Sequence, residues 1–135
     1  MDIYLIDTSV WINYFKATET AASLFLKNNT GNIIIATCPV IMQEVLQGIV
    51  HEKEFKAIHS YLKKLLPLIN NQYELAHDAA VLYRSLRSKG VTVRKSNDCL
   101  IAAYAIKNGI TILHDDRDFD LIAKHSSLKI MNFTN

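Results

Sequence analysis

Short apolar segments alternate along this chain with longer segments of helical periodicity, and this alternation constrains the fold more than any other feature. Apolar runs occupy residues 3–6, 33–36 and 111–113, and a last one is expected at 129–133. Strands that are apolar at every position are typical of parallel sheets whose two faces are covered by helices. The sequence therefore predicts an α/β fold, a three-layer α/β/α sandwich around a short parallel sheet.

The segments between these runs have the periodicity and end signals of helices. Helices are expected directly after Asp7-Thr8-Ser9, any of which is a suitable cap, and then over residues 21–28, 39–50, 53–66, 74–89, 97–107 and 119–125. Pro39 suits a first helical turn, and Gly90 and Gly109 suit helix C-termini. Pro67 is expected to close the 53–66 helix, with a brief extended segment at 68–69.

Length and composition indicate an ordinary globular protein. The 135 residues suit a single domain, residues 1–135, and 50% of them are hydrophobic. No stretch approaches the ~20 apolar residues of a membrane helix, and the N-terminus lacks the basic region of a signal peptide. Cys38 and Cys99 lie among apolar neighbours, which favours buried free thiols in a reducing compartment. We therefore expect a cytoplasmic protein with no membrane association.

Acidic residues gather where the predicted strands end. Asp7 follows the first strand, and Asp115 and Asp116 follow the strand at 111–113. Sites in open parallel sheets form outside the carboxyl ends of the strands, so these acids should meet at one edge. Glu44 and Asp98 are placed to join them from the starts or first turns of helices.

Each acid also has a purely structural interpretation. Asp7 suits a helix cap, and Asp98 suits the positive end of its helix dipole. Glu44 is compatible with an exposed helix position. Asp118 suits an N-cap for the 119–125 helix, and Asp120 its first turn.

Convergence of several carboxylates favours a functional site over these separate explanations. Three or four carboxylates at one edge cannot all stay ionised unless a cation neutralises them. Oxygen ligands without a cluster of His and Cys favour Mg²⁺, with Mn²⁺ as a substitute. The five histidines show no ligand spacing, and a structural role is favoured for His114. Such a metal site is suited to the hydrolysis of phosphodiesters.

Four motifs resemble those of PIN-domain ribonucleases, particularly the VapC-type toxins of bacterial toxin–antitoxin pairs. The motifs are IYLIDTSVWI, PVIMQEVLQG, SNDCLIAAYAIKNG and ILHDDRDFDLIA, in family order over nearly the whole chain. The resemblance implies a PIN-like sandwich and four principal acids, which are Asp7, Glu44, Asp98 and Asp116. Gly48 completes the E-x-x-x-G element that begins at Glu44.

The resemblance also implies roles for neighbours of these acids. Asp118 corresponds to a second acid of the last motif, either assisting the site or capping a helix. Asp115 stands where relatives often carry Asn and is expected to add negative potential at the rim. Ser9 is expected to bond a carboxylate or a metal-bound water, whereas Thr8 is expected to satisfy only backbone groups.

The implied activity is metal-assisted hydrolysis of RNA. Asp7 and Asp98 are the expected direct ligands of Mg²⁺, while Glu44 and Asp116 bind a second ion or hold metal-bound waters. Basic residues are expected to bind the RNA backbone at the rim, and the candidates are Arg84, Arg87, Arg94 and Lys95. The implied protein partners are a second copy in a homodimer and a VapB-type antitoxin that covers the active-site groove. Trp11, Tyr14 and Phe15 either line that groove or pack in the core.

Two alternatives remain at the level of sequence. A receiver-like, phosphate-handling signalling domain has a similar size and an acidic pocket at strand ends, but it usually carries its acidic pair near the first strand. A PIN-like binding module without catalysis would be favoured by loss of acids, yet all four principal acids are present.

Overall fold

A parallel sheet forms the centre of the computed structural model, which describes residues 1–133. The sheet order is β3-β2-β1-β4, and its strands are β1 (Ile3–Ile6), β2 (Ile34–Thr37), β3 (Leu66–Pro67) and β4 (Thr111–Leu113). All three pairings are parallel, and Leu5 in β1 lies opposite Ala36 on one side and Ile112 on the other. These three side chains are fully buried, as expected for central strands covered on both faces.

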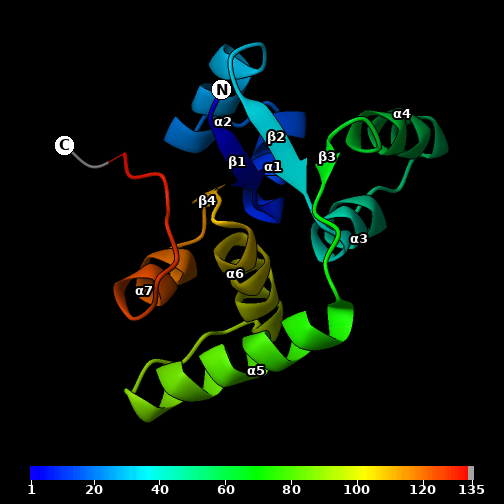
Figure 1. Ribbon diagram of the computed structural model, residues 1–135. Helices are drawn as coiled ribbons and strands as arrows, with labels where there is room; N and C mark the ends of the chain where they lie inside the picture. The colour runs from blue at the N-terminus through cyan, green and yellow to red at the C-terminus, as the bar shows by residue number, and fades with distance from the viewer. Residues whose placement is uncertain (134–135) are drawn as a thin grey trace.

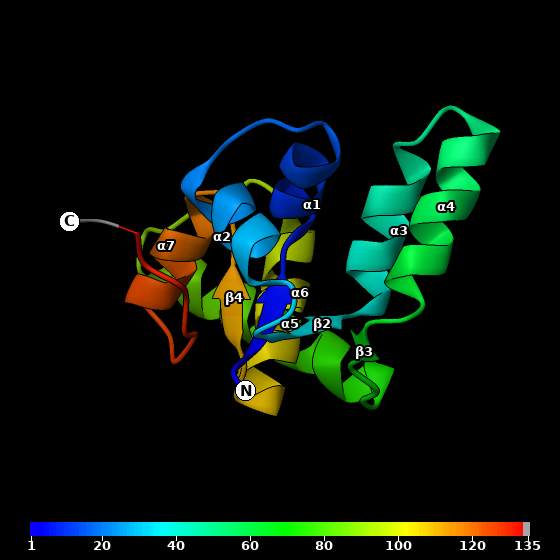
Figure 2. The same ribbon diagram turned by 90° about the horizontal axis from the view of Figure 1, so that it is seen from above.

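Helices cover both faces of this sheet. They are α1 (Thr8–Phe15), α2 (Ala21–Asn29), α3 (Pro39–Gln47), α4 (Glu52–Leu62), α5 (Gln72–Ser88), α6 (Ser96–Asn108) and α7 (Asp118–Lys124). In Figure 1, α6 lies below the sheet with α5 beneath it, whereas α2 lies above. Figure 2 shows α3 and α4 side by side at the β3 end and α7 beyond β4. The predicted three-layer α/β/α sandwich is confirmed.

Helix ends follow local chemistry at several of the predicted positions. Pro39 occupies the first turn of α3, where its missing N–H costs nothing. Gly109 ends α6 with a φ of 64°, a left-handed conformation that is strained for residues with a Cβ. The side chain of Thr20 caps α2 and forms a reciprocal capping box with Ser23. Helix boundaries are thus encoded locally.

Four predicted elements differ in the structure, and one of them is the extended segment expected at 68–69, which lies at 66–67 as β3. The 53–66 helix was predicted too long, because α4 ends at Leu62 and residues 66–67 form the edge strand β3 beside β2. Pro67 is tolerated there because an edge strand does not require every N–H to be paired. The helix predicted over 39–50 also ends early, at Gln47.

The predicted final strand over residues 129–133 is not formed. This segment makes a single parallel bridge, between Ile130 and Ile112. Two backbone hydrogen bonds form that bridge. The N–H of Ile112 donates to the carbonyl of Lys129, and the carbonyl of Ile112 accepts from the N–H of Met131. Ile106, in the last turn of α6, is exposed.

The core joins the sheet to helices on both faces. Trp11 is fully buried and contacts the rings of Tyr14, Phe15 and Tyr61, so core packing is the correct interpretation for this side chain. The two cysteines are buried and free, as predicted. Within residues 1–133, no helix combines the length and apolar character needed to cross a bilayer.

Candidate metal centre

Asp7 lies where β1 ends and α1 begins. Its backbone N–H donates to the carbonyl of Leu113 at the end of β4, which places the two strand ends side by side. The buried Asp7 carboxylate caps α1, accepting bonds from the backbone N–H of Ser9 at 3.0 Å and from its Oγ at 2.6 Å. Ser9 Oγ also accepts from the N–H of Asp115. Asp7 is therefore both a helix cap and a site residue, and Ser9 connects it to the loop after β4.

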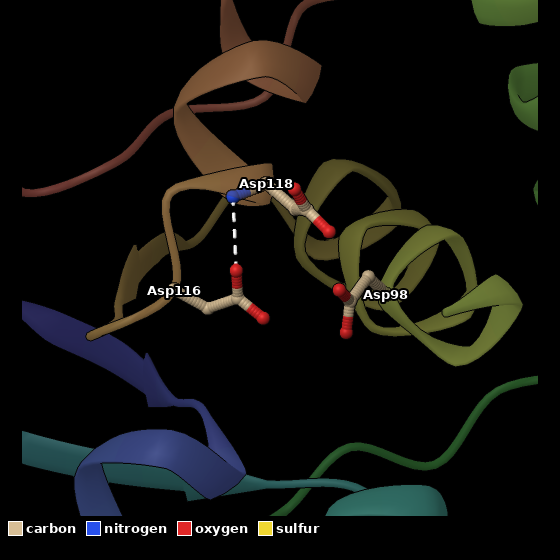
Figure 3. A group of neighbouring side chains, drawn as sticks. All are labelled: Asp98, Asp116 and Asp118. Atoms are coloured by element: carbon tan, nitrogen blue, oxygen red, sulfur yellow. Dashed lines mark hydrogen bonds between the residues drawn. The ribbon is translucent and has the colours of Figure 1, made fainter. Parts of the chain in front are cut away.

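Asp98, Asp116 and Asp118 form a buried triad beside Asp7. One carboxylate oxygen from each lies within 4.8 Å of the others. Figure 3 shows Asp98 reaching from α6 toward the other two, which come from the β4–α7 loop and the start of α7. The N–H of Asp118 donates to Asp116 Oδ1 at 3.0 Å and fixes the turn between them.

The interpretation of Asp118 as the N-cap of the last helix is wrong. Asp118 is the first residue of α7, and the cap position belongs to Arg117, which makes no side-chain cap bond. The Asp118 side chain is 4% exposed and turns into the triad instead. Asp120 occupies the first turn of α7, as expected, and its carboxylate bonds His114.

Glu44 lies outside the triad but is hydrogen-bonded to residues adjacent to Asp7 and Asp98. Its half-buried carboxylate accepts from Thr8 Oγ1 at 2.7 Å and from Asn97 Nδ2 at 3.4 Å. Thr8 neighbours Asp7 and Asn97 neighbours Asp98, so Glu44 connects the two motifs. The expectation that Thr8 satisfies only backbone groups is wrong. Sequence reasoning missed Asn97, although its place in the first turn beside Asp98 was a usable signal.

Arg94 and Lys95, which precede α6, pair with the triad. Arg94 Nε lies 3.1 Å from Asp118 Oδ2, and its Nη2 lies 3.2 Å from Asp116 Oδ1. Lys95 Nζ lies 3.2 Å from Asp116 Oδ2 and 3.9 Å from Asp98 Oδ1. Two of the four basic candidates therefore reach the acids.

The other two basic candidates lie on α5 and are exposed. Arg87 lies over the ring of Tyr83, 5.8 Å from its centroid. Arg84 lines a cleft between α5 and α6 that also includes Ser96 and Asn97 at the start of α6. Arg84 therefore borders the approach to the acids without pairing with them.

The acids differ in pKa because burial and neighbouring charges act on each of them differently. The pKa of Asp98 is raised to about 7, chiefly by burial and also by the charges of Asp7, Asp116 and Asp118, against the opposing effect of Lys95. Burial also raises the pKa of Asp7, although the bonds from Ser9 oppose it. For Asp116, burial is outweighed by the N–H of Asp118 and by the two basic neighbours, which lower its pKa. A bound cation would therefore favour the ionised form of the Asp98 carboxylate more than that of the other acids.

The residues fit a hard divalent cation. Asp98 Oδ2 is buried and has no hydrogen-bond partner among the described residues, a costly state for a carboxylate oxygen. The triad offers only carboxylate oxygens, the ligands preferred by Mg²⁺ and Mn²⁺, and includes no His or Cys. A divalent cation would satisfy Asp98 Oδ2 and offset the repulsion within the triad.

Hydrogen bonds around His114 and Asp115 support this geometry. His114 Nδ1 accepts from the N–H of Asp116, while its Nε2 bonds Asp120 and its ring packs on Phe119. His114 therefore holds the Asp116 backbone, in line with the structural role favoured for it. Asp115 accepts bonds from Asn13 and Thr20 at the rim, which fixes the α1–α2 connection against this loop.

Comparisons with known proteins agree with the fold. A family model for the PIN domain matches residues 4–125. The chain is 39% identical to ribonuclease VapC11 of Mycobacterium tuberculosis and to VapC ribonuclease Mb1587 of Mycobacterium bovis, over 96% of this chain and 98% of each relative. The chain thus belongs to the PIN domain family.

Within that family, the chain belongs with the VapC ribonucleases and is an enzyme of that class. This confirms the family predicted from the motifs. Solved structures share its fold: VapBC2 from Rickettsia felis, bound to a DNA fragment from its promoter, has a TM-score of 0.74 at 18% identity. VapBC-1 from nontypeable Haemophilus influenzae has a TM-score of 0.73 at 17% identity. Each match covers 98% of this chain and 99% of the other.

Proposed function

We propose that this protein is a Mg²⁺-dependent endoribonuclease and the toxin of a VapBC-type pair. The observation that carries the metal dependence is the unpartnered, buried Asp98 Oδ2 within a triad of carboxylates. Membership of the VapC ribonucleases supports RNA as the substrate. It also argues against the receiver-like alternative, and the complete set of acids argues against a binding module without catalysis.

The proposed site has two groups of acids. Asp98, Asp116 and Asp118 hold the cation, and Asp7 and Glu44 complete the acidic wall. A divalent ion held by these residues would supply an activated water and positive charge to offset the negative charge developing on the phosphate. Ser9 orients the Asp7 carboxylate, and Thr8 orients that of Glu44.

The chain's own residues then bind and orient the RNA. Arg94 and Lys95 lie at the mouth of the acidic site, where their exposed side chains can attract a phosphate. Arg84 and Arg87 extend this positive charge along α5, and we propose that the RNA backbone follows it. The site thus combines an acidic centre with a basic border, which suits a polyanion that reacts at a cation.

The proposed protein partners are a VapB-type antitoxin and a second copy of the chain. The fold is shared with toxins crystallised as VapBC complexes, which supports the antitoxin. A groove between α1 and the α3–α4 pair is lined by Ile12, Phe15, Val45 and Ile58 and reaches Glu44. An antitoxin segment in this groove would cover the site. We also propose that residues 1–135 act as one PIN domain within a homodimer.

An RNA cleavage assay with purified protein tests this function. We expect cleavage with Mg²⁺, none with EDTA, and losses of at least about 100-fold for Asp7→Asn and Asp98→Asn. Asp2→Asn is the matched control, because Asp2 is exposed and immediately precedes β1, at the opposite end from Asp7. Equal cleavage by the control and both site variants would refute the assignment of the site.

A further inference from the structure

Lys95 and Arg94 are neighbours in sequence but pair with different oxygens of the triad. Arg94 binds Asp116 Oδ1, the oxygen that also accepts the N–H of Asp118. The remaining oxygen of Asp116 points toward Asp98 in Figure 3. Lys95 Nζ lies between these two carboxylates, 3.2 Å from Asp116 Oδ2 and 3.9 Å from Asp98 Oδ1. The ammonium therefore pairs with one oxygen of Asp116 and, at longer range, with one oxygen of Asp98.

A divalent ion at the triad would compete with this ammonium. Both cations would draw on the carboxylates of Asp98 and Asp116, and like charges a few ångströms apart repel each other. The Lys95 side chain is 55% exposed, whereas the two carboxylates are buried. Because a lysine ammonium is a mobile, strongly hydrated charge, it can leave for solvent while the buried acids stay in place.

We propose that Lys95 is an intramolecular counter-ion, which occupies the cation position in the metal-free protein and is displaced when a divalent ion binds. The displaced ammonium then faces the mouth of the site, where it contacts a phosphate of the substrate. This inference rests on the proposed metal-dependent RNA cleavage. It assigns Lys95 two successive partners, first the carboxylates and then the RNA.

Arg94 has the contrasting role of a fixed clamp. Its planar guanidinium bonds both Asp116 and Asp118. It binds Asp116 through Oδ1, the oxygen that also accepts the N–H of Asp118, and leaves Oδ2 to Lys95 or to an ion. Arg94 therefore remains paired after the ion binds and keeps the two carboxylates in position.

Mn²⁺ binding to the purified full chain, measured by calorimetry, tests the displacement. We expect Lys95→Met to bind Mn²⁺ about three- to tenfold more tightly, because the ion no longer breaks ion pairs to buried carboxylates. Lys107→Met, which removes the same charge at the far end of α6, should stay within about twofold of the wild type. Arg94→Met should bind no more tightly than the wild type, because its loss frees the carboxylates it positions.

Two results would overturn the displacement. Lys95→Met that binds Mn²⁺ no more tightly than the wild type would show that the ammonium does not compete. Equal tightening in Arg94→Met and Lys95→Met would show that losing any nearby positive charge is sufficient. If the wild type binds no divalent ion, the proposed metal-dependent function fails as well, whereas binding without tightening in Lys95→Met refutes this inference alone.

Steady-state cleavage at saturating metal tests the second partner. We expect Lys95→Met to raise KM for RNA about three- to tenfold with a smaller change in kcat, although the same variant binds the metal more tightly. A residue that merely supports the fold would weaken both metal and RNA binding. An unchanged KM would refute the contact between Lys95 and the substrate phosphate.

Discussion

Asp98→Asn should stabilise the metal-free protein at neutral pH while removing its activity. Burial raises the pKa of Asp98 from 3.8 to about 7, so above that pH the folded chain holds an ionised carboxylate in an unfavourable place. A shift of about 3 units corresponds to at most about 4 kcal/mol of lost stability. The amide introduced in the variant brings a buried NH2 group with no partner, which offsets this gain by about 1–3 kcal/mol. We therefore expect a net gain of about 1–3 kcal/mol at pH 8.

The pH dependence follows from proton binding. Between pH 4 and pH 7 the folded state binds more protons at Asp98 than the unfolded state does, because the folded pKa is the higher one. Stability of the metal-free wild type therefore falls as the pH rises through this window. The raised pKa of Asp7 acts in the same direction, so the slope in Asp98→Asn should be smaller but not zero.

Urea unfolding in EDTA at several values between pH 5 and pH 8 measures this effect. Repeating the series with Mg²⁺ should stabilise the wild type, since the ion binds only the folded site, and should stabilise Asp98→Asn much less. The reasoning would be refuted if Asp98→Asn were less stable than the wild type at pH 8 in EDTA. An unchanged slope between pH 5 and pH 7 would contradict the raised pKa.

Three further variants test the supporting structure. Ser9→Ala should lose about 1–2 kcal/mol in urea unfolding and about tenfold in RNA cleavage, because Ser9 Oγ bonds both the Asp7 carboxylate and the loop after β4. Gly109→Ala should lose about 1 kcal/mol because of its φ of 64°, whereas Gly31→Ala, with no atom within 4 Å of the added Cβ and no positive φ, should change stability by less than about 0.5 kcal/mol. Phe119→Ala should lose about 3–5 kcal/mol, since the ring is fully buried against His114; a smaller loss in thermal and urea unfolding would show that the site collapses around the void.

The strands and helix ends that sequence predicted well are those with strong local signals. Residues 3–6 and 111–113 were predicted with the same bounds as β1 and β4, because a strand covered by helices on both faces is apolar throughout. The segments at 66–67 and 129–133 were predicted wrongly, because edge pairing depends on which neighbour is available. An apolar pair such as Leu66-Pro67 carries no information about that neighbour.

The sequence by itself determined the fold class and the family and pointed to the candidate acids, since periodicity and motif order can be read without coordinates. Only the tertiary structure decided how those acids divide. It placed Asp118 in the triad with Asp98 and Asp116, and it linked Glu44 to Thr8 and Asn97 instead. Carboxylates at strand ends share an edge in any parallel sheet, but their oxygens meet only where the packing of α6 and α7 aims them. The pairing of Lys95 with Asp98 and Asp116 likewise depends on where α6 starts, because the partner of a flexible side chain is set by position in space and not in sequence.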